Sequence, residues 1–463
     1  MFKYMRQDKG FYGNLFALAL PIIMQNLIMM SLAMIDTFMV GLLGEVPLAA
    51  VTVANTPVFV IQLLIFGLQS GSSVLISQYW GKQDKDAISR VIGIGIYLAG
   101  TLSTLFALVM FLFPEDSMRL FCNNESLIPL AADYVRIVGF SYIFNSITGI
   151  YTGAHRSMEN PKLGLWIFSV SMCLNTFLNW ILIFGKLGAP ALGVEGAAIA
   201  TLISRVVEFI IMIVYAKFNK RFIMKLRLLV LPGKEMLKKF FRYSTPVVLN
   251  ETLWGLGTAL YPTIMGHMEG STEILAAYTI AGSIEKICTV AVFAVAATAA
   301  IIVGREIGKG HREEAYSVGA ALGMVAFLMG LGTGLIMICL VNVLVAPYVY
   351  PLFGLSAASG SIATMMQMVT FIFLAPRAYN STNIVGVLRG GGDVRAATLI
   401  DVLPLWLVAI PMAAICGLAL HAGIFWVCIA MAVENIVKFF FGLWRFRSKK
   451  WINDLTAISH PQG

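Results

Sequence analysis

Long apolar runs dominate this chain and recur along its whole length, with only short polar segments between them. Hydrophobic residues make up 59% of its 463 residues, and charged residues make up 12%. Soluble domains carry about 25% charged residues, so this composition does not suit a protein surrounded by water. Backbone groups in lipid must be hydrogen-bonded within the protein, which favours helices. The expected fold class is an all-α polytopic membrane protein.

A membrane-spanning helix needs about 20 mainly apolar residues, and this template predicts twelve such helices. Glycine and proline interrupt several of the runs, which membrane helices tolerate. The expected ranges are 12–40, 48–78, 88–113, 130–155, 162–184, 193–217, 240–267, 273–303, 315–346, 361–388, 396–418 and 423–446.

Lysine and arginine are concentrated in alternate connections between the predicted spans. Nine lie in residues 217–242, whereas Arg119, Arg136 and Lys186 are nearly all that the opposite connections hold. Cytoplasmic loops are enriched in these residues. The pattern predicts a multi-pass protein of the cell membrane (plasma or inner membrane) with both termini cytoplasmic. The net charge of +9 is therefore a topology signal, and we expect no nucleic-acid partner.

The two halves of the chain resemble each other. "ALPIIMQNL" (19–27) corresponds to "STPVVLNET" (244–252), and "LAAVTVAN" (48–55) corresponds to "LAAYTIAG" (275–282). Six predicted spans separate the copies, so both halves have the same orientation in the membrane. Parallel repeats of this kind are a known transporter plan, and two paired bundles suit alternating access.

This repeat divides the chain into three predicted parts. Residues 1–216 would form an N-lobe of six helices, and residues 240–463 a C-lobe of six helices with a cytoplasmic tail. Residues 217–239 would form a basic cytoplasmic linker between them.

Asp36 is a carboxylate inside the first apolar run. Inserting a charged side chain into a membrane costs about 2.5–3.5 kcal/mol, so a charge at such a position suggests a functional role. Gln25 lies three helical turns before it on the same face, and Pro21 can bend the helix there. Asn175 and Asn179 share one face of the fifth predicted span. Together these residues offer oxygen ligands for Na⁺, and a buried carboxylate alone can bind a proton. The alternatives are an outer-interface position for Asp36 and simple helix cross-linking for the asparagines.

The second half has its own intramembrane acids, Glu251, Asp401 and Glu285. Glu251 and Asp401 have no obvious basic neighbour on their own helices, and Lys286 follows Glu285 directly. All three acids are candidates for binding a cation or a substrate. The alternative is that they form buried ion pairs that fix helix packing. Two further pairs, Arg205/Glu208 and Glu434/Lys438, have the spacing of local ion pairs on one helix.

Polar residues recur every seven positions along the second predicted span. This stripe would line a wet cavity or hydrogen-bond to other helices, and the two interpretations are equally supported. Methionines in the first span would either pack against lipid and protein or form an adaptable wall for apolar substrates. The residues predicted to line a cavity are Gln25, Met34, Asn55, Gln62, Gln69 and Trp254.

Enzymatic motifs are not evident. The histidines are scattered and the cysteines lack metal-ligand spacing, and no nucleophile elbow, phosphate loop or dinucleotide fingerprint occurs. We therefore expect a protein that is not an enzyme and that needs no cofactor.

Four further features complete the pattern. Pro21 precedes Asp36 by fifteen residues, "NTFLNWILIFG" lies in the fifth span, "GKQDKDA" and "GKGHREEA" follow spans two and eight, and "RGGGDVRAATLID" leads to Asp401. With the two six-span repeats, they resemble the multidrug and toxic compound extrusion (MATE) transporters, of the bacterial NorM/DinF type. The resemblance covers residues 11–450.

This resemblance implies a V-shaped pair of lobes that exports cationic or amphipathic compounds in exchange for Na⁺ or H⁺. It implies an N-lobe cation site at Asp36, Asn175, Asn179 and Thr201, with Na⁺ held by the first three. It likewise implies that Glu251 and Asp401 are candidates for a cation or substrate site in the C-lobe. Some members have an aspartate where this chain has Asn179, so the choice between Na⁺ and H⁺ stays open. The partners would be small molecules and the lipid bilayer, and we expect a monomer.

Two other functions are alternatives to this interpretation. A lipid or lipid-linked oligosaccharide flippase of the same superfamily would share this plan, but it would favour a strongly basic cavity. An integral membrane enzyme would need a catalytic cluster near one membrane interface, and no such cluster stands out.

Overall fold

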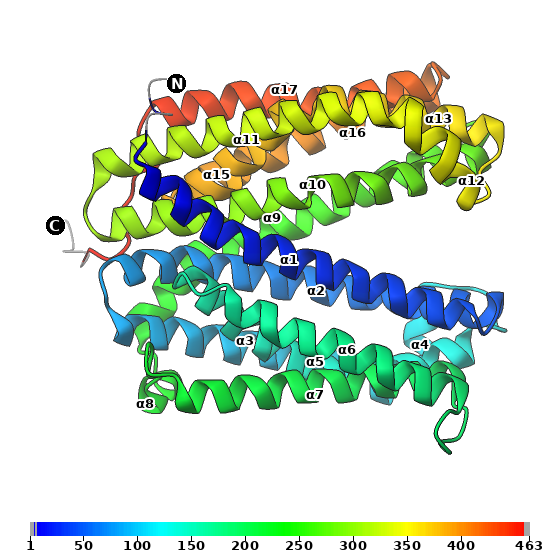
Figure 1. The fold of residues 1–463 in the computed structure, drawn as a ribbon, viewed down its shortest axis with the longest axis horizontal. Helices are drawn as coiled ribbons and strands as arrows, with labels where there is room; N and C mark the ends of the chain where they lie inside the picture. The colour runs from blue at the N-terminus through cyan, green and yellow to red at the C-terminus, as the bar shows by residue number, and fades with distance from the viewer. Residues whose placement is uncertain (1–3, 5–6, 458–463) are drawn as a thin grey trace. The chain divides into compact units, whose positions relative to one another are not determined.

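The computed structural model describes residue 4 and residues 7–457, and all its regular elements are helices (Figure 1). No β-strand occurs among these described residues. The predicted all-α class is therefore confirmed. The chain ends, residues 1–3, 5–6 and 458–463, lie outside the described part, and the predicted cytoplasmic location of the termini stays a prediction.

Each predicted span coincides with one helix or with consecutive helices, and the ends differ by a few residues. In the first half they are α1 (Lys9–Gly41), α2 (Glu45–Gly81), α3 (Lys85–Leu112), α5 (Ile128–Ser157), α6 (Lys162–Phe184) and α7 (Gly193–Phe218). Continuous helices in the second half are α9 (Lys234–Gly266), α10 (Ser271–Gly308), α11 (Arg312–Leu340) and α17 (Ile424–Arg447). Short helices are α4 (Pro114–Arg119), α8 (Leu226–Val230) and α12 (Tyr350–Leu352).

Nine helices of the described chain are long and apolar enough to cross a membrane, or ten if one bent pair counts as a single span. The helices α5 and α9 match two further predicted spans in length, but they are not among those nine. The chain is thus a polytopic membrane protein, and the total of twelve spans stays a prediction.

Several spans of the second half are interrupted. The tenth predicted span consists of α13 (Ala357–Ile372), α14 (Leu374–Asn380) and the π-helix η3 (Ser381–Leu388), with a bend of 53° after α13. The eleventh consists of α15 (Val394–Pro404), η4 (Leu405–Ala409), α16 (Ile410–Ala414) and η5 (Ile415–Ala419), and η2 (Val341–Val349) follows α11. Proline lacks the backbone N–H that a regular helix needs, and Pro347 and Pro404 lie in or next to π-helices. Such segments often mark functional sites.

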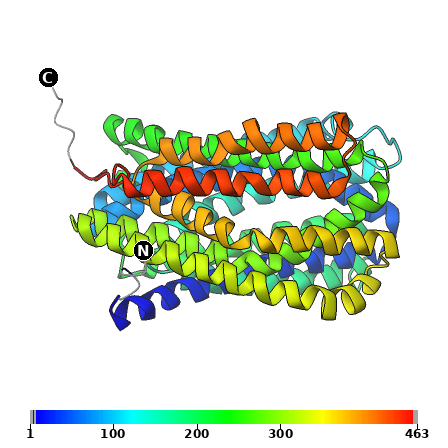
Figure 2. The same ribbon diagram turned by 90° about the horizontal axis from the view of Figure 1, so that it is seen from above.

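Contacts divide the chain into two compact units. The N-unit is Pro21–Val248, and the C-unit is Leu249–Gly463 together with Met1–Leu20. Within each unit the long helices run alongside one another (Figures 1 and 2). The predicted lobes, 1–216 and 240–463 with a linker at 217–239, follow chain order, and that division stays a prediction.

The first helix of each half contributes its opening turns to the unit of the other half. Leu15 and Leu18 of α1 are buried in a C-unit cluster formed with α10, α11, η3 and α15. The opening turns of α9 belong to the N-unit and end at Val248. In both helices the change of unit falls at or close to a proline, Pro21 or Pro246, where a helix is easiest to bend.

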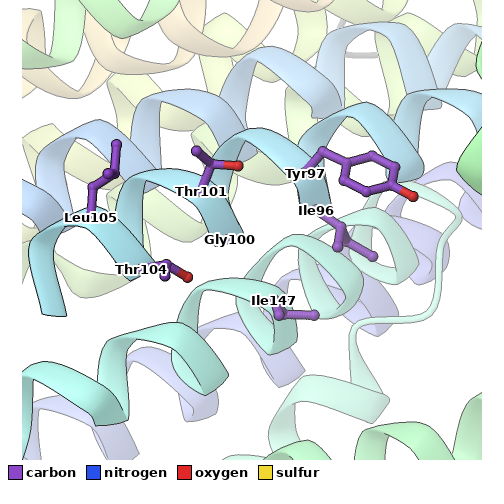
Figure 3. Close-up of a pocket in the computed structure, with 7 residues that line it drawn as sticks. All are labelled: Ile96, Tyr97, Gly100, Thr101, Thr104, Leu105 and Ile147. Carbon is purple, nitrogen blue, oxygen red and sulfur yellow. The ribbon is translucent and has the colours of Figure 1, made fainter. Parts of the chain in front are cut away.

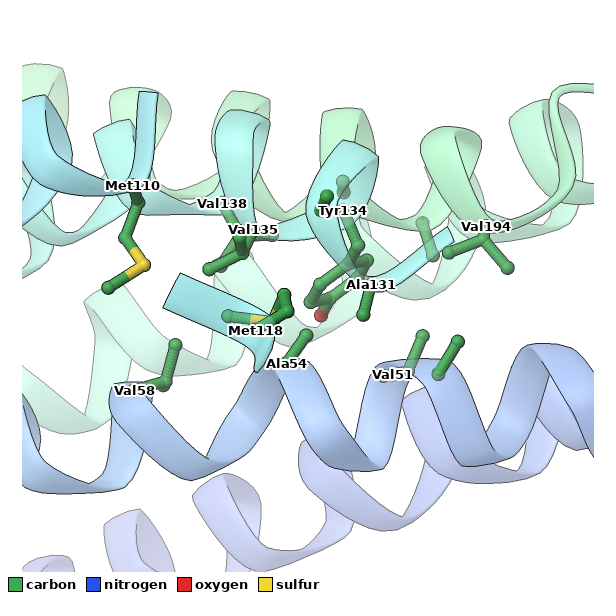
Figure 4. Close-up of a cluster of buried hydrophobic side chains, with 14 of the residues drawn as sticks. Val51, Ala54, Val58, Met110, Met118, Ala131, Tyr134, Val135, Val138 and Val194 are labelled. Atoms are coloured by element: carbon green, nitrogen blue, oxygen red, sulfur yellow. The ribbon is translucent and has the colours of Figure 1, made fainter. Parts of the chain in front are cut away.

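The N-unit is held together by a core in which α2 and α5 face each other, with additions from α3, α4 and α7 (Figure 4). Small residues such as Ala54 and Ala131 are fully buried there. Small side chains let membrane helices approach closely and pack by van der Waals contact. The basic segment after α7 also packs on this unit, because Lys225 pairs with Asp86 at 2.8 Å.

A glycine surface on α2 receives the opening turns of α9. A methyl group on Gly71 would lie 2.7 Å from the Cα of Ser244, and one on Gly67 would lie 2.7 Å from the Cα of Val248. Both distances are too short for carbon atoms, so this contact depends on glycine.

We predict that Gly71→Ala destabilises the N-unit by about 1–3 kcal/mol, because the new methyl group must push α9 away. The thermal unfolding midpoint of the purified protein in lipid nanodiscs measures this. Gly149→Ala is the matched control, since no atom lies within 4 Å of a methyl group there. Equal midpoints for the two variants would contradict the close contact.

Candidate functional site

Asp36 lies in a small hydrogen-bonded cluster between α1 and α6. The Asn179 side-chain amide donates to Asp36 Oδ1 at 2.6 Å and to Asn175 Oδ1 at 3.0 Å. Asn175 in turn donates to Thr201 Oγ1 of α7 at 3.5 Å. Both asparagines are buried, whereas Asp36 and Thr201 are half-buried. The structure therefore brings together the four residues predicted for the N-lobe site.

The helical spacing explains this cluster. Asn175 and Asn179 are four residues apart and share one face of α6. Further down the same two helices, a methyl group on Gly164 of α6 would meet Gln25 Oε1 of α1 at 2.8 Å. Since Gln25 precedes Asp36 and Gly164 precedes Asn179, α1 and α6 run side by side in the same direction.

The cluster has unused oxygen ligands. Asn179 Oδ1 is buried and has no hydrogen-bond partner among the described residues. A half-turn of this amide would exchange its oxygen and nitrogen and direct the oxygen towards Asp36. A carboxylate with amide and hydroxyl oxygens is a donor set for a hard cation such as Na⁺, while the carboxylate alone can take a proton.

A second charged pair lies near this cluster. Arg205 and Glu208 of α7 form an ion pair of 2.7 Å, as the sequence predicts. The charge of Arg205 also acts on Asp36, but the two form no ion pair within the described chain. Asp36 is thus held by an amide and not by a base.

Every candidate acid of the second half has a base from another helix. Glu251 pairs with Arg389 at 2.7 Å, and Glu285 pairs with Arg377. Asp401 pairs with Lys438 of α17 at 2.9 Å. A cation or a substrate ammonium group would have to compete with these bases, and the predicted cation or substrate roles of the three acids stay predictions.

The sequence did not predict these three bases as partners of the acids, and the reason differs for each base. The tenth span was predicted to end at residue 388, which put Arg389 in the connection after it. In the structure Arg389 follows η3 directly and is only 2% exposed. Arg377 lies inside that span, where a lone charge in an apolar run was a usable signal. The third base, Lys438, was expected to pair with Glu434 on its own helix, and it does so only at 3.7 Å.

Asn250 is another site residue that the sequence left unassigned. Its amide donates to Asp401 Oδ2 at 2.9 Å, and Trp406 of η4 donates to the Leu253 carbonyl at 3.1 Å. α9 and α15 therefore run side by side in the same direction, as α1 and α6 do. Asn250 follows Pro246 by four residues as Gln25 follows Pro21, and this correspondence was the available signal.

The residues predicted to line a cavity have varied environments. Met34, Asn55, Gln62 and Trp254 are exposed, Gln69 is half-buried, and Gln25 and Pro21 are buried. Gln62 donates to the Tyr142 hydroxyl at 2.9 Å, so part of the polar stripe cross-links α2 and α5. A cavity-lining role for the set stays a prediction.

A groove of about 390 Å³ lies on α3 and α5 of the N-unit (Figure 3). It contains none of the predicted site residues and no charged side chain; its lining is Ile96, Tyr97, Gly100, Thr101, Thr104, Leu105 and Ile147. Its chemistry does not suit a cation.

The turn between α10 and α11 gathers two acids and a histidine. Ligand atoms of Glu306, His311 and Glu314 lie within 4.8 Å of one another. However, Arg305 and Lys309 already contact Glu306, at 2.7 Å and 3.1 Å. These two positive charges neutralise the position that a metal ion would need.

Comparison with known proteins gives one family. The sequence profile described as MatE matches residues 21–181 and 246–415. An uncharacterized transporter YisQ from Bacillus subtilis (strain 168) is 25% identical, over 96% of this chain and 96% of its own. A probable multidrug resistance protein NorM from Thermotoga maritima is 24% identical, over 95% of this chain and 92% of its own.

Solved structures share the fold. One is described as the outward-facing conformation of a multidrug resistance MATE family transporter of the MOP superfamily, with a TM-score of 0.84 and 22% identity, over 97% of this chain and 98% of its own. Another is a MOP superfamily transporter from Pyrococcus furiosus with a TM-score of 0.83 and 22% identity, over 97% and 98% of the two chains. At this identity the likeness establishes the fold alone.

The Glu251–Arg389 pair yields a testable prediction about stability. Arg389→Leu leaves the half-buried Glu251 carboxylate without its base. We expect this to lower the free energy of unfolding by about 3–5 kcal/mol. Replacing both residues by leucine should recover most of this loss, because no uncompensated charge remains. Thermal unfolding in nanodiscs measures both variants. A double variant as unstable as the single one would show that the pair is not the source of the loss.

Proposed function

Because the chain belongs to the MatE family of membrane transporters, we propose that it exports cationic or amphipathic organic compounds in exchange for Na⁺ or H⁺. Relatives such as the probable multidrug resistance protein NorM of Thermotoga maritima support the export of small molecules. The coupling ion would enter the cell as the compound leaves, by alternating access of the two halves.

One observation carries the assignment of the coupling site. Of the four acids considered, Asp36, Glu251, Glu285 and Asp401, Asp36 alone has no ion pair with a base within the described chain. A carboxylate in an apolar environment is costly unless a cation or a proton neutralises it. The N-unit is therefore the half that we propose to carry the coupling ion.

Exchange follows from this charge requirement. When Na⁺ or a proton binds to Asp36, the negative charge of the carboxylate is neutralised. The site then no longer attracts a cationic compound electrostatically. When the ion leaves, the carboxylate again favours a cation. The ion and the compound would thus bind alternately, which is the condition for antiport.

Transport in proteoliposomes tests this function. Ethidium movement is measured under an imposed Na⁺ gradient and separately under a pH gradient, for the wild type and for Asp36→Asn. We expect one gradient to drive transport, and Asp36→Asn to abolish the coupled part, because it removes the only charge that the ion neutralises at this site. Glu125→Gln, which changes an exposed acid outside the spans, should transport as the wild type does.

Two results would count against the proposal. Normal coupled transport by Asp36→Asn would remove Asp36 from the coupling path. Failure of both gradients to move ethidium in the wild type would exclude a broad drug antiporter, and the same liposomes would then be assayed for flipping of labelled lipids and lipid-linked oligosaccharides.

Asn179→Leu identifies the ion by the direction of its effect. The amide donates to the Asp36 carboxylate, and hydrogen bonds to charged groups contribute about 1.5–3 kcal/mol. If Na⁺ is coupled, losing this ligand should raise the Na⁺ concentration for half-maximal transport by about tenfold or more. If H⁺ is coupled, losing the donor should favour the protonated acid and shift the half-maximal pH upwards by about one unit.

Ser169→Ala is the control for this substitution on the same helix, because the Ser169 hydroxyl bonds only its own helix backbone at Leu165 in the described contacts. An unchanged ion dependence in Asn179→Leu would show that the amide does not contact the bound ion or proton.

A further inference from the structure

Four acids lie inside the spanning helices of the C-unit, away from the first and last turns: Glu251, Glu285, Asp401 and Glu434. Three of them have a base of their own on another helix, with pairs Glu251–Arg389, Glu285–Arg377 and Asp401–Lys438. Each of these three bases lies closest to another acid, so Glu434 has no such base of its own.

The geometry around Lys438 identifies the surplus acid. Its ammonium nitrogen lies 2.9 Å from Asp401 Oδ1 but 3.7 Å from Glu434 Oε2. The shorter distance is a hydrogen bond and the longer one is not. Asp401 also accepts from Asn250 at 2.9 Å, whereas Glu434 Oε2 is buried with no hydrogen-bond partner among the described residues.

Apart from Lys438, no base of the described residues forms an ion pair with Glu434. Arg377 and Asp401 act on it electrostatically, but each is already paired with another residue. Tyr261 of α9, which also interacts with Glu434, is uncharged at neutral pH. Lys286 of α10 is exposed and forms no ion pair within the described chain. An ionised Glu434 would therefore add one uncompensated charge to an apolar bundle.

We propose that Glu434 is a second protonation site of this transporter, and that Lys438 moves between Asp401 and Glu434 as the proton leaves and returns. A proton fits this position better than a metal ion, because the Lys438 ammonium group would repel a metal cation at the same oxygen. A metal ion also needs several oxygen ligands, whereas a proton needs one.

The exchange of the proton changes a contact between helices. When Glu434 releases its proton to water, it becomes a carboxylate, and Lys438 needs to move by about 1 Å to reach hydrogen-bond distance from it. That movement weakens the Lys438–Asp401 bond, which joins α17 to α15. Protonation of Glu434 thus sets how tightly α17 is joined to α15. The helix α15 belongs to the predicted span that also contains η4 and η5.

This site is separate from the proposed ion site at Asp36, and its test does not require transport. The full chain is reconstituted in lipid in an Asp36→Asn background, so that the N-unit acid cannot contribute. Infrared spectroscopy at neutral pH then measures the carbonyl band of protonated carboxyl groups. Glu434→Gln is compared with Glu313→Gln, which changes an acid whose side chain is 86% exposed.

We expect Glu434→Gln to lose the absorption of one protonated carboxyl group and Glu313→Gln to lose none. An unchanged band in Glu434→Gln would overturn the proposal, because Glu434 would then be ionised. Lys438→Met decides the question independently if Glu434→Gln does not fold. Loss of the base should protonate Asp401 alone and add one carboxyl group to the band, whereas a gain of two would show that Glu434 was ionised before the change.

Discussion

Buried charge is the constraint on which both units depend. An ionised side chain in an apolar bundle is costly unless an opposite charge or hydrogen bonds compensate it. In the C-unit three acids meet Arg377, Arg389 and Lys438 from other helices. These ion pairs require the helices to keep one rotation and one register, because a small displacement would leave a charge without its partner.

The two halves use one helix arrangement for different chemistry. In each half the first helix runs beside the fifth in the same direction, and an amide four residues after a proline meets that fifth helix. Gln25 lies there against Gly164, which has no side chain, whereas Asn250 meets Asp401. In each unit, nevertheless, one base pairs closely with one acid, and a second acid nearby has no close ion pair among the described residues. In the N-unit Arg205 pairs with Glu208 and not with Asp36. In the C-unit Lys438 lies closer to Asp401 than to Glu434.

The positions of the spans were predictable because apolarity is a property of neighbouring residues. The segment predicted at 162–184 is α6 to the residue, and the local pair Arg205/Glu208 follows from helical spacing alone. The cluster of Asp36, Asn175 and Asn179 could be anticipated from spacing within each helix and from the family resemblance. The acids of the second half were recognised as intramembrane charges, but their partners were not.

The sequence by itself determined the membrane class, the location of the helices, the internal repeat and the residue pairs that share one helix face. These depend on hydrophobicity and on a period of 3.6 residues, both of which are local. Only the tertiary structure decided that Glu251 meets Arg389, that Lys438 binds Asp401 more closely than Glu434, and that α1 and α9 each begin in the unit of the other half. These contacts join residues far apart in the chain, and they depend on how each helix is rotated and shifted against its neighbours, which no local pattern specifies.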